Sequence, residues 1–372
     1  MERFYFDNAG TTKVFDETAK EMMRILTKDF YNPSALYSQD IKAEVESARQ
    51  YIAEQIDVSN SEIIFTSGAT EADNWALLCG QKNKNGNVII SEGEHSAIYE
   101  TAGELKSKGI EVRYAPLDKS GKLNYDKFAE LLDENTSLVS IICCSNETGA
   151  VNDLTLIKEM IDDKCKRAVF HSDCVQALCK VPFDYSAPDI MSFSAHKLGG
   201  PKGIGALAIK KGLKIKPLIT GGGQEKNMRS GTENCAGIVG FASAIRCFNQ
   251  KIDRALVKKM KLALKETLCG IDGVSVHDGE GNSDFILSAS IIGIKSEILQ
   301  HLLYDEGFVI GLGSACSAKT GKNRVLKAMG VPEKEIEGNI RISFGCDNTM
   351  EQAEMLCASL EKNIKILKGK LR

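Results

Sequence analysis

Residues 192–203 read Ser-Phe-Ser-Ala-His-Lys-Leu-Gly-Gly-Pro-Lys-Gly, so that a lysine, Lys197, stands between small polar side chains and a glycine-rich loop. The glycines and the proline favour tight bends of the backbone, and the serine and histidine side chains could bind a phosphate. An enzyme that holds an aldehyde cofactor covalently needs such an amine beside a phosphate site. Lys197 is therefore a candidate for a lysine that carries pyridoxal 5'-phosphate (PLP).

Short β-rich runs on both sides of this stretch alternate with amphipathic helices. We expect buried strands at residues 63–65, 88–90, 138–143, 168–170 and 206–209. The apolar faces of two helices are marked by Ile41, Val45, Ala48 and Ile52, and by Leu154, Ile157, Met160 and Ile161. This alternation predicts a mainly parallel sheet with helices on both faces, which binds ligands at the carboxyl ends of its strands.

The length of 372 residues predicts about two domains, and the sequence pattern changes near residue 250. A lysine-rich helix and shorter strands follow that point, and a last helix begins near Met350. We expect a large cofactor-binding domain at residues 15–250, with residues 1–14 and 251–372 forming a smaller α+β domain.

Composition argues against several classes of protein. The net charge is -3 and no basic stretch interleaves with aromatic residues, so a nucleic acid is not expected as a direct ligand. The longest apolar runs are too short for a bilayer, and the first residues lack the pattern of a signal peptide, so we expect a cytoplasmic protein without a membrane partner. The twelve cysteines include no CxxC pair, and no metal site is predicted.

Further polar residues stand next to the predicted strands and could complete a PLP site. Residues 66–71, Thr-Ser-Gly-Ala-Thr-Glu, open a helix whose first amides favour a phosphate, although a plain helix cap is an equal alternative. Asp173 could hold a pyridine nitrogen protonated, or could simply cap a helix. His95 lies between a strand and a helix, where it could stack on a ring and exchange protons. Asn146 and Gln176 could bond the phenolic oxygen of the cofactor, and Asn146 could equally be a turn residue.

Taken in order along the chain, these motifs resemble those of the cysteine desulfurases, which belong to the class V aminotransferase group of fold-type I PLP enzymes. The resemblance runs from residue 4 to about residue 346 and includes Asp7-Asn8-Ala9-Gly10-Thr11-Thr12, Met228-Arg229-Ser230-Gly231-Thr232 and Gly313-Ser314-Ala315-Cys316-Ser317. The last motif is similar to the NifS/IscS type. The resemblance implies an α/β fold: a large domain with a mainly parallel seven-stranded sheet between helices, and a smaller α+β domain.

The resemblance also implies a role for individual residues. Lys197 would carry PLP, Asp173 would face its ring nitrogen, and His95 would be the stacking acid–base residue. Asn146 and Gln176 would bond the ring oxygen. The phosphate would be held by Ala69, Thr70, Ser194 and His196. Thr232 would reach the phosphate in a neighbouring subunit, so a homodimer with shared active sites is implied. Arg341 would bind the carboxylate of the substrate, with Asn32 nearby.

Cys316 would be the nucleophile that accepts sulfur. The implied reaction converts L-cysteine to L-alanine and leaves a persulfide on Cys316, which passes to an acceptor protein such as an iron–sulfur scaffold or a tRNA-thiolation enzyme. Two rivals use the same fold, a selenocysteine lyase and an aminotransferase of small amino acids. A third is a non-catalytic sulfur carrier or scaffold subunit.

Overall fold

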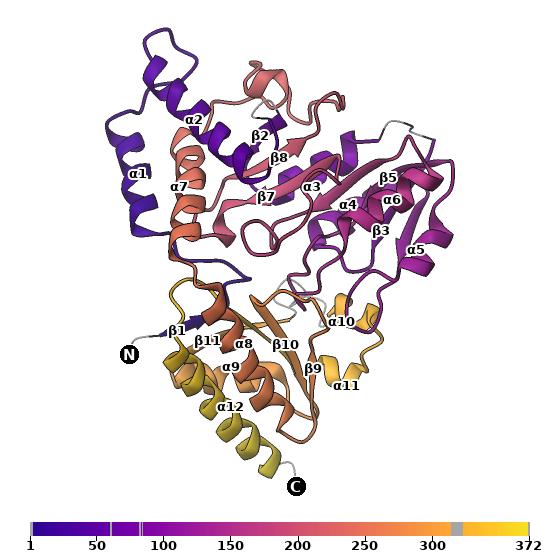
Figure 1. Cartoon of the computed structure of the whole chain (residues 1–372), viewed down its shortest axis with the longest axis vertical. Coiled ribbons are helices and arrows are strands. Elements are labelled where there is room, and N and C mark those ends of the chain that lie inside the picture. Colours follow the sequence, from indigo (N-terminus) through magenta and orange to yellow (C-terminus); the bar gives the residue numbers. More distant parts are fainter. Residues whose placement is uncertain (1–2, 60–61, 82, 84, 314–322, 371–372) are drawn as a thin grey trace.

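The computed structural model describes residues 3–59, 62–81, 83, 85–313 and 323–370 of the chain. Cys316, the predicted nucleophile, therefore lies outside the described residues. Two β-sheets organise the molecule, a larger one in the upper part of Figure 1 and a smaller one below it, next to both termini.

The larger sheet has seven strands in the order β2-β8-β7-β6-β5-β3-β4. β8 runs antiparallel to its neighbours β2 and β7, and the other pairs are parallel. This confirms the mainly parallel seven-stranded sheet. Its strands are β2 (Ile63–Thr66), β3 (Asn87–Ser91), β4 (Val112–Ala115), β5 (Thr136–Ser140), β6 (Val169–Asp173), β7 (Ile190–Ser194) and β8 (Gly205–Ile209).

Helices cover both faces of this sheet. Alternate residues of its strands point to opposite sides, and both sets are apolar, so both faces have to be buried. Ile89 of β3 packs in one apolar cluster, whereas its neighbours Val88 and Ile90 pack in another. The predicted helix faces are confirmed, since all four marked residues of α2 and three of the four in α6 are buried. The helices around the sheet are α1 (Asp16–Thr27), α2 (Gln39–Gln55), α3 (Ala69–Cys79), α4 (Ser96–Ser107), α5 (Tyr125–Leu131), α6 (Leu154–Lys164) and α7 (Cys235–Lys251).

One expected strand is shorter than predicted. β5 ends at Ser140, before the predicted end at Cys143. The amides of Ile141 and Cys143 still bond His171 O and Asp173 O, at 3.1 and 2.9 Å, so the apolar run continues beside β6 as it leaves the regular strand. This departure carries the following polar residues to the edge of the sheet.

The smaller sheet has the order β1-β11-β12-β10-β9, and only β1 and β11 pair in parallel. β1 comes from the start of the chain, so the residues after it pass from this sheet toward the larger one. The remaining strands are β1 (Phe4–Phe6), β9 (Val274–His277), β10 (Ile286–Ile291), β11 (Phe308–Leu312) and β12 (Asn339–Ser343). The accompanying helices are α8 (Arg254–Cys269), α9 (Ser296–Asp305), α10 (Arg324–Ala328), α11 (Glu333–Ile336) and α12 (Met350–Lys370).

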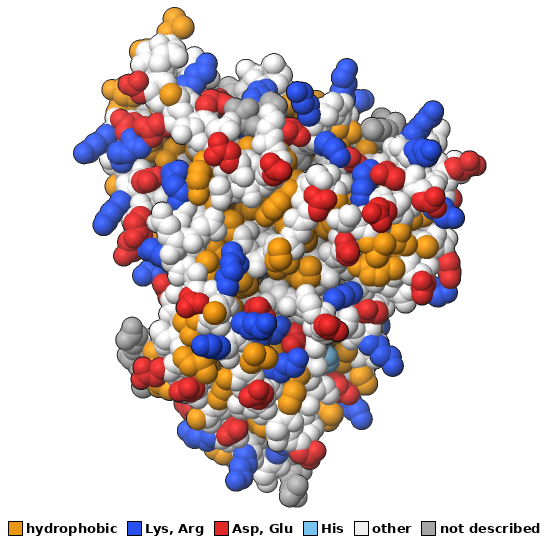
Figure 2. Space-filling view, in the orientation of Figure 1, with side chains coloured by type: hydrophobic (Ala, Val, Ile, Leu, Met, Phe, Trp, Pro, Cys, Tyr) orange, Lys and Arg blue, Asp and Glu red, His pale blue; other side chains and the backbone are white. Residues whose placement is uncertain are grey.

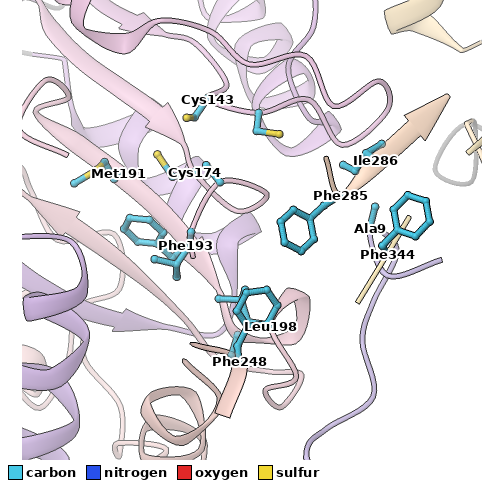
Figure 3. Packing of buried hydrophobic residues seen from close by; sticks show 14 of the residues in the cluster. Ala9, Cys143, Cys174, Met191, Phe193, Leu198, Phe248, Phe285, Ile286 and Phe344 are labelled. Carbon is cyan, nitrogen blue, oxygen red and sulfur yellow. The ribbon is translucent and has the colours of Figure 1, made fainter. Parts of the chain in front are cut away.

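A single apolar cluster joins the two sheets. It includes Met191 and Phe193 of the larger sheet, and Ile286 of the smaller one with Phe344 just after β12. Figure 3 shows these side chains with Ala9, which comes from the segment that connects the sheets near the N-terminus. The two sheets therefore share one packed core.

Among the described residues, none of the helices combines the length and the apolar character needed to span a bilayer. Within the same part of the chain, histidine, cysteine and acidic side chains do not gather in threes at a possible metal position.

Candidate active site

A cavity of about 590 Å³ lies where the carboxyl ends of the central strands meet the N-terminal segment and β12. Parallel strands bring their following loops to one edge of a sheet, and ligands bind at that edge. The wall residues that the sequence had singled out are Ala69, Thr70, His95, Asn146, Asp173, Gln176, Ser194, His196, Lys197 and Arg341.

Lys197 lies in a short 3₁₀ turn, Ala195–Lys197, directly after β7. Its Nζ donates hydrogen bonds to the backbone carbonyls of Ala9 and Gly10, at 2.7 and 2.6 Å. Burial lowers the pKa of Lys197 to about 8, and the positive charges of Arg341 and Lys180 add to this effect. The amine is therefore neutral more often than an ordinary lysine and is suited to attack a carbonyl carbon.

Asp173 is the last residue of β6 and is 4% exposed. Its Oδ1 accepts a hydrogen bond of 2.9 Å from the amide of Val175. Burial raises the pKa of Asp173, while His95 and Lys197, when protonated, and the hydrogen bond from the amide of Val175 lower it. A buried carboxylate gains stability from a cation placed against it, so a protonated ring nitrogen would fit this position.

His95 is the N-cap residue of α4, and its Nδ1 accepts a hydrogen bond of 3.2 Å from the amide of Ala97. A neutral imidazole with an accepting Nδ1 carries its proton on Nε2. Burial lowers the pKa of His95, and the charges of Lys197 and Arg324 lower it further, whereas Asp173 raises it. A neutral ring with one proton to donate is suited to stacking and to proton exchange.

The start of α3 forms another part of the wall, through Ala69 and Thr70. The first amides of a helix have no acceptor within the helix and favour an anion. Ser194 and His196 line the same cavity, and His196 Nδ1 lies 3.1 Å from Thr11 Oγ1. Burial lowers the pKa of His196 to about 4, so the ring is neutral near pH 7. The donors suit a phosphate.

Arg341 contributes a cation from β12, where it is 4% exposed. Its Nη2 donates to Asp7 Oδ1 at 2.8 Å, and its Nη1 donates to the backbone carbonyl of Asn146 at 2.9 Å. The side-chain Nδ2 of Asn146 donates to Glu147 Oε1 at 2.9 Å. The guanidinium is thus held in place at the cavity wall by Asp7 of the N-terminal segment and by the backbone of the loop that follows β5.

The side-chain amide of Gln176 makes two hydrogen bonds, one through its nitrogen and one through its oxygen. Its Nε2 donates to the carbonyl of Ala9 at 3.0 Å, and its Oε1 accepts from Lys180 Nζ at 3.3 Å. Gln176 therefore links β6 to the same N-terminal backbone that Lys197 contacts.

Two predicted residues do not line this cavity within the described part of the chain. Asn32 and Thr232 are both exposed, and Thr232 borders a separate, smaller depression. Cys316 is not described, and the chain on either side of it is described up to Gly313 and from Asn323.

Several residues of the cavity wall were not predicted from the sequence. Asp73, Glu147 and Lys202 line the cavity, and backbone carbonyls of the N-terminal segment hold the amine of Lys197. Asp73 follows Thr70 by three positions on α3, so helical spacing could have placed it on the same face. The carbonyl contacts carried no side-chain signal in the sequence.

Together these groups fit PLP by the chemistry of their donors. Anion-binding donors, a carboxylate and an amine of lowered pKa share one cavity, which matches the phosphate, the ring nitrogen and the aldehyde of the cofactor. The cavity volume lies in the range typical of cofactor sites.

Comparison with known proteins agrees with this chemistry. Residues 4–356 match the family described as aminotransferase class-V. A protein named cysteine desulfurase IscS from Clostridium botulinum is 36% identical over 98% of this chain and 95% of its own length. A solved structure titled NIFS-LIKE PROTEIN has a TM-score of 0.90 at 36% identity and covers 98% of this chain and 99% of its own. Another, titled SspA in complex with cysteine, has a TM-score of 0.82 at 30% identity and covers 92% of this chain and 98% of its own.

Proposed function

The chain belongs to the aminotransferase class-V family, and we infer that it is a PLP-dependent cysteine desulfurase. It converts L-cysteine to L-alanine and transfers the sulfur to an acceptor. The observation that carries this conclusion is that one cavity contains both the Lys197 amine, whose pKa is lowered, and the buried carboxyl of Asp173. The chain that forms this cavity is 36% identical to a cysteine desulfurase.

We propose a distinct task for each group around the substrate. Bound PLP supplies a sink for the electrons released at the substrate's α-carbon. Lys197 Nζ would take the α-proton and return it, because an amine of pKa about 8 exchanges protons readily near neutral pH. Asp173 would hold the proton on the ring nitrogen, and His95 would exchange protons with the substrate. Arg341 would bind the substrate carboxylate.

Cys316 would perform the sulfur transfer. Its thiolate would attack the substrate's Sγ, so that an S–S bond forms and the substrate's Cβ–S bond breaks. The electron pair of the broken bond stays with the substrate, which gains protons and leaves as alanine. The persulfide on Cys316 would then pass its outer sulfur to the thiol of an acceptor protein, either an iron–sulfur scaffold or a tRNA-thiolation enzyme.

The function is tested by two variants and one matched control. We expect Lys197→Ala to lose both the visible absorbance of bound PLP and the formation of alanine. We expect Cys316→Ala to keep the absorbance and lose sulfide release. Cys269, an exposed free thiol, provides the control, since Cys269→Ala should retain both. Full sulfide release by Cys316→Ala would refute the assigned nucleophile.

We also propose a homodimer in which Thr232 reaches the phosphate of the other copy's cofactor. Two features support it: Thr232 is exposed away from its own cavity, and the loop between α1 and α2 exposes large apolar side chains. They are Phe30 (67% exposed), Tyr31 (47%), Leu36 (92%) and Tyr37 (77%). This loop forms the tip at the top of Figure 1, and Figure 2 shows apolar atoms there. Asn32 belongs to the same loop, so dimer formation could also bring it to a site.

Mixing two inactive variants tests the shared sites. If Lys197 and Thr232 serve one site from different copies, a heterodimer of Lys197→Ala with Thr232→Ala contains one site with neither change. Co-expression should therefore restore activity that each variant lacks alone. A monomer in light scattering, or no restoration in a purified heterodimer, would contradict the proposal. The domain boundaries near residues 15 and 250 and the cytoplasmic location stay predictions from the sequence.

A further inference from the structure

Arg324 extends from the first turn of α10 to a loop that lies 230 residues earlier in the chain. Its guanidinium donates hydrogen bonds to the backbone carbonyls of Glu92 and Glu94. It also lies over the ring of Tyr99, 3.9 Å from the centroid. One side chain thus contacts both the loop before α4 and the helix itself, with His95 between these contacts.

The helix that carries Arg324 is itself firmly placed. Asn323 caps α10 by accepting a hydrogen bond of 3.1 Å from the amide of Leu326. Val325, Leu326 and Met329 pack with Leu117, which follows β4 of the larger sheet. Capping and apolar packing both restrain α10. The contacts of Arg324 therefore join the loop before α4 to a helix whose own position is fixed.

The same loop is held from its other side. Glu94 is 1% exposed, and its Oε1 accepts hydrogen bonds from Ser91 Oγ at 2.5 Å and from the amide of Ile142 at 2.8 Å. Ile142 follows β5, so this contact ties the loop to the middle of the sheet. Among the described residues, the hydrogen bonds that join this loop to α10 come from Arg324.

We propose that Arg324 is a positioning residue, which holds the loop at Glu92–His95 and with it the His95 ring at the wall of the active-site cavity. The inference rests on the acid–base role proposed for His95. A planar guanidinium donates to two carbonyls and stacks on a ring at the same time, which the ammonium group of lysine does not reproduce. General acid–base catalysis depends on placement, and small displacements of a catalytic group reduce rates strongly.

Arg324 acts on His95 through its charge as well as through the backbone. Burial is the main reason why the pKa of His95 is lowered; Asp173 raises it, and Lys197 and Arg324 lower it. Removing the positive charge of Arg324 should therefore raise the pKa of His95. Arg324→Lys separates the two effects, because it retains the charge and loses the forked geometry.

The test compares the PLP-loaded wild type with Arg324→Lys and Arg324→Gln, and uses Lys327→Gln as the matched control. Lys327 is an exposed cation on the same helix, outside the site. We expect both Arg324 variants to lose about tenfold or more in kcat, with little change in KM for cysteine. An NMR titration of ¹³C-labelled histidines should show a raised His95 pKa in Arg324→Gln alone. Lys327→Gln should match the wild type in every measurement.

Other outcomes would overturn the inference. Full kcat in Arg324→Lys would reduce the role of Arg324 to charge, and unchanged kcat and His95 titration in both variants would remove the role altogether. A loss of activity that only follows a loss of PLP absorbance would indicate general destabilisation. If the variants fold poorly, Tyr99→Leu, which removes the stacking ring, should still lower kcat. His95→Asn, which also assigns the NMR signal, tests the acid–base role separately: full activity there would refute that role, whereas the Arg324→Gln titration would still report the contact.

Discussion

The Lys197 amine should combine with PLP at a rate whose pH dependence levels off near pH 8. Burial in the cavity, with Arg341 and Lys180 nearby, lowers its pKa to about 8. At pH 7 such an amine is neutral in about 9% of molecules, whereas an ordinary lysine of pKa about 10.4 is neutral in about 0.04%. The cavity thus raises the reactive fraction roughly two hundred-fold at pH 7, and this gain disappears above about pH 10.

The assay mixes the cofactor-free protein with PLP and follows the visible absorbance between pH 6 and pH 10. The rate should rise about tenfold per pH unit up to pH 7 and level off above pH 8. N-α-acetyl-lysine, measured in parallel, corrects for the titration of PLP itself. A corrected rate for Lys197 that continues to rise to pH 10 would show an ordinary amine and would refute the reasoning from burial.

Three further predictions concern residues that support the site. Arg49 forms a buried two-pronged pair with Glu225, at 2.7 and 2.8 Å, so Arg49→Met should lower the free energy of unfolding in urea by about 3–5 kcal/mol. The double variant with Glu225→Gln should lose less, and an equal loss would contradict this account. Burial and the charge of Asp173 raise the pKa of Asp73, so its carboxyl favours the protonated form, and the stability that it contributes is lost as pH rises. Asp73→Asn should therefore gain stability over the wild type as the pH rises above the usual pKa of an aspartate, by up to about 1.4 kcal/mol per pH unit, and a difference that stays constant with pH would contradict the raised pKa. A Cβ at Gly311 would collide with the carboxylate of Asp7, which orients Arg341, the residue proposed to bind the substrate carboxylate. Gly311→Ala should therefore raise KM for cysteine several-fold more than it lowers kcat in steady-state kinetics, and a larger fall in kcat than rise in KM would contradict this account.

Much of the fold was predictable because the spacing of apolar residues within a short stretch of sequence indicates which side chains are buried. Continuous apolar runs predicted the central strands, and helical spacing predicted the buried face of α2. The end of β5 was placed too late, because Ile141 to Cys143 remain buried beside β6 after the regular strand ends. A burial pattern alone does not show where a strand stops being regular.

The candidate site was predictable where a polar residue stands at the end of a strand or just after it, as Asp173 and Lys197 do. It was not predictable where the contact is made by backbone or by a distant side chain. The carbonyls of Ala9 and Gly10 on the lysine amine have no sequence signature, since every residue carries a carbonyl. The contact of Arg324 with the carbonyl of Glu94 joins positions 230 residues apart, and the sequence around either position does not predict it.

The sequence by itself therefore determined the kinds of element, their apolar faces and the polar residues at the strand ends, because these depend on neighbours within a few positions. Only the tertiary structure decided the strand order β2-β8-β7-β6-β5-β3-β4, the return of the N-terminal strand to β11 and the pairing of Asp7 with Arg341. Those features depend on segments that are far apart in the chain and meet only when both sheets bury their faces in one core. The lowered pKa of Lys197 belongs with them, because burial and the charges that surround it exist only in the folded protein.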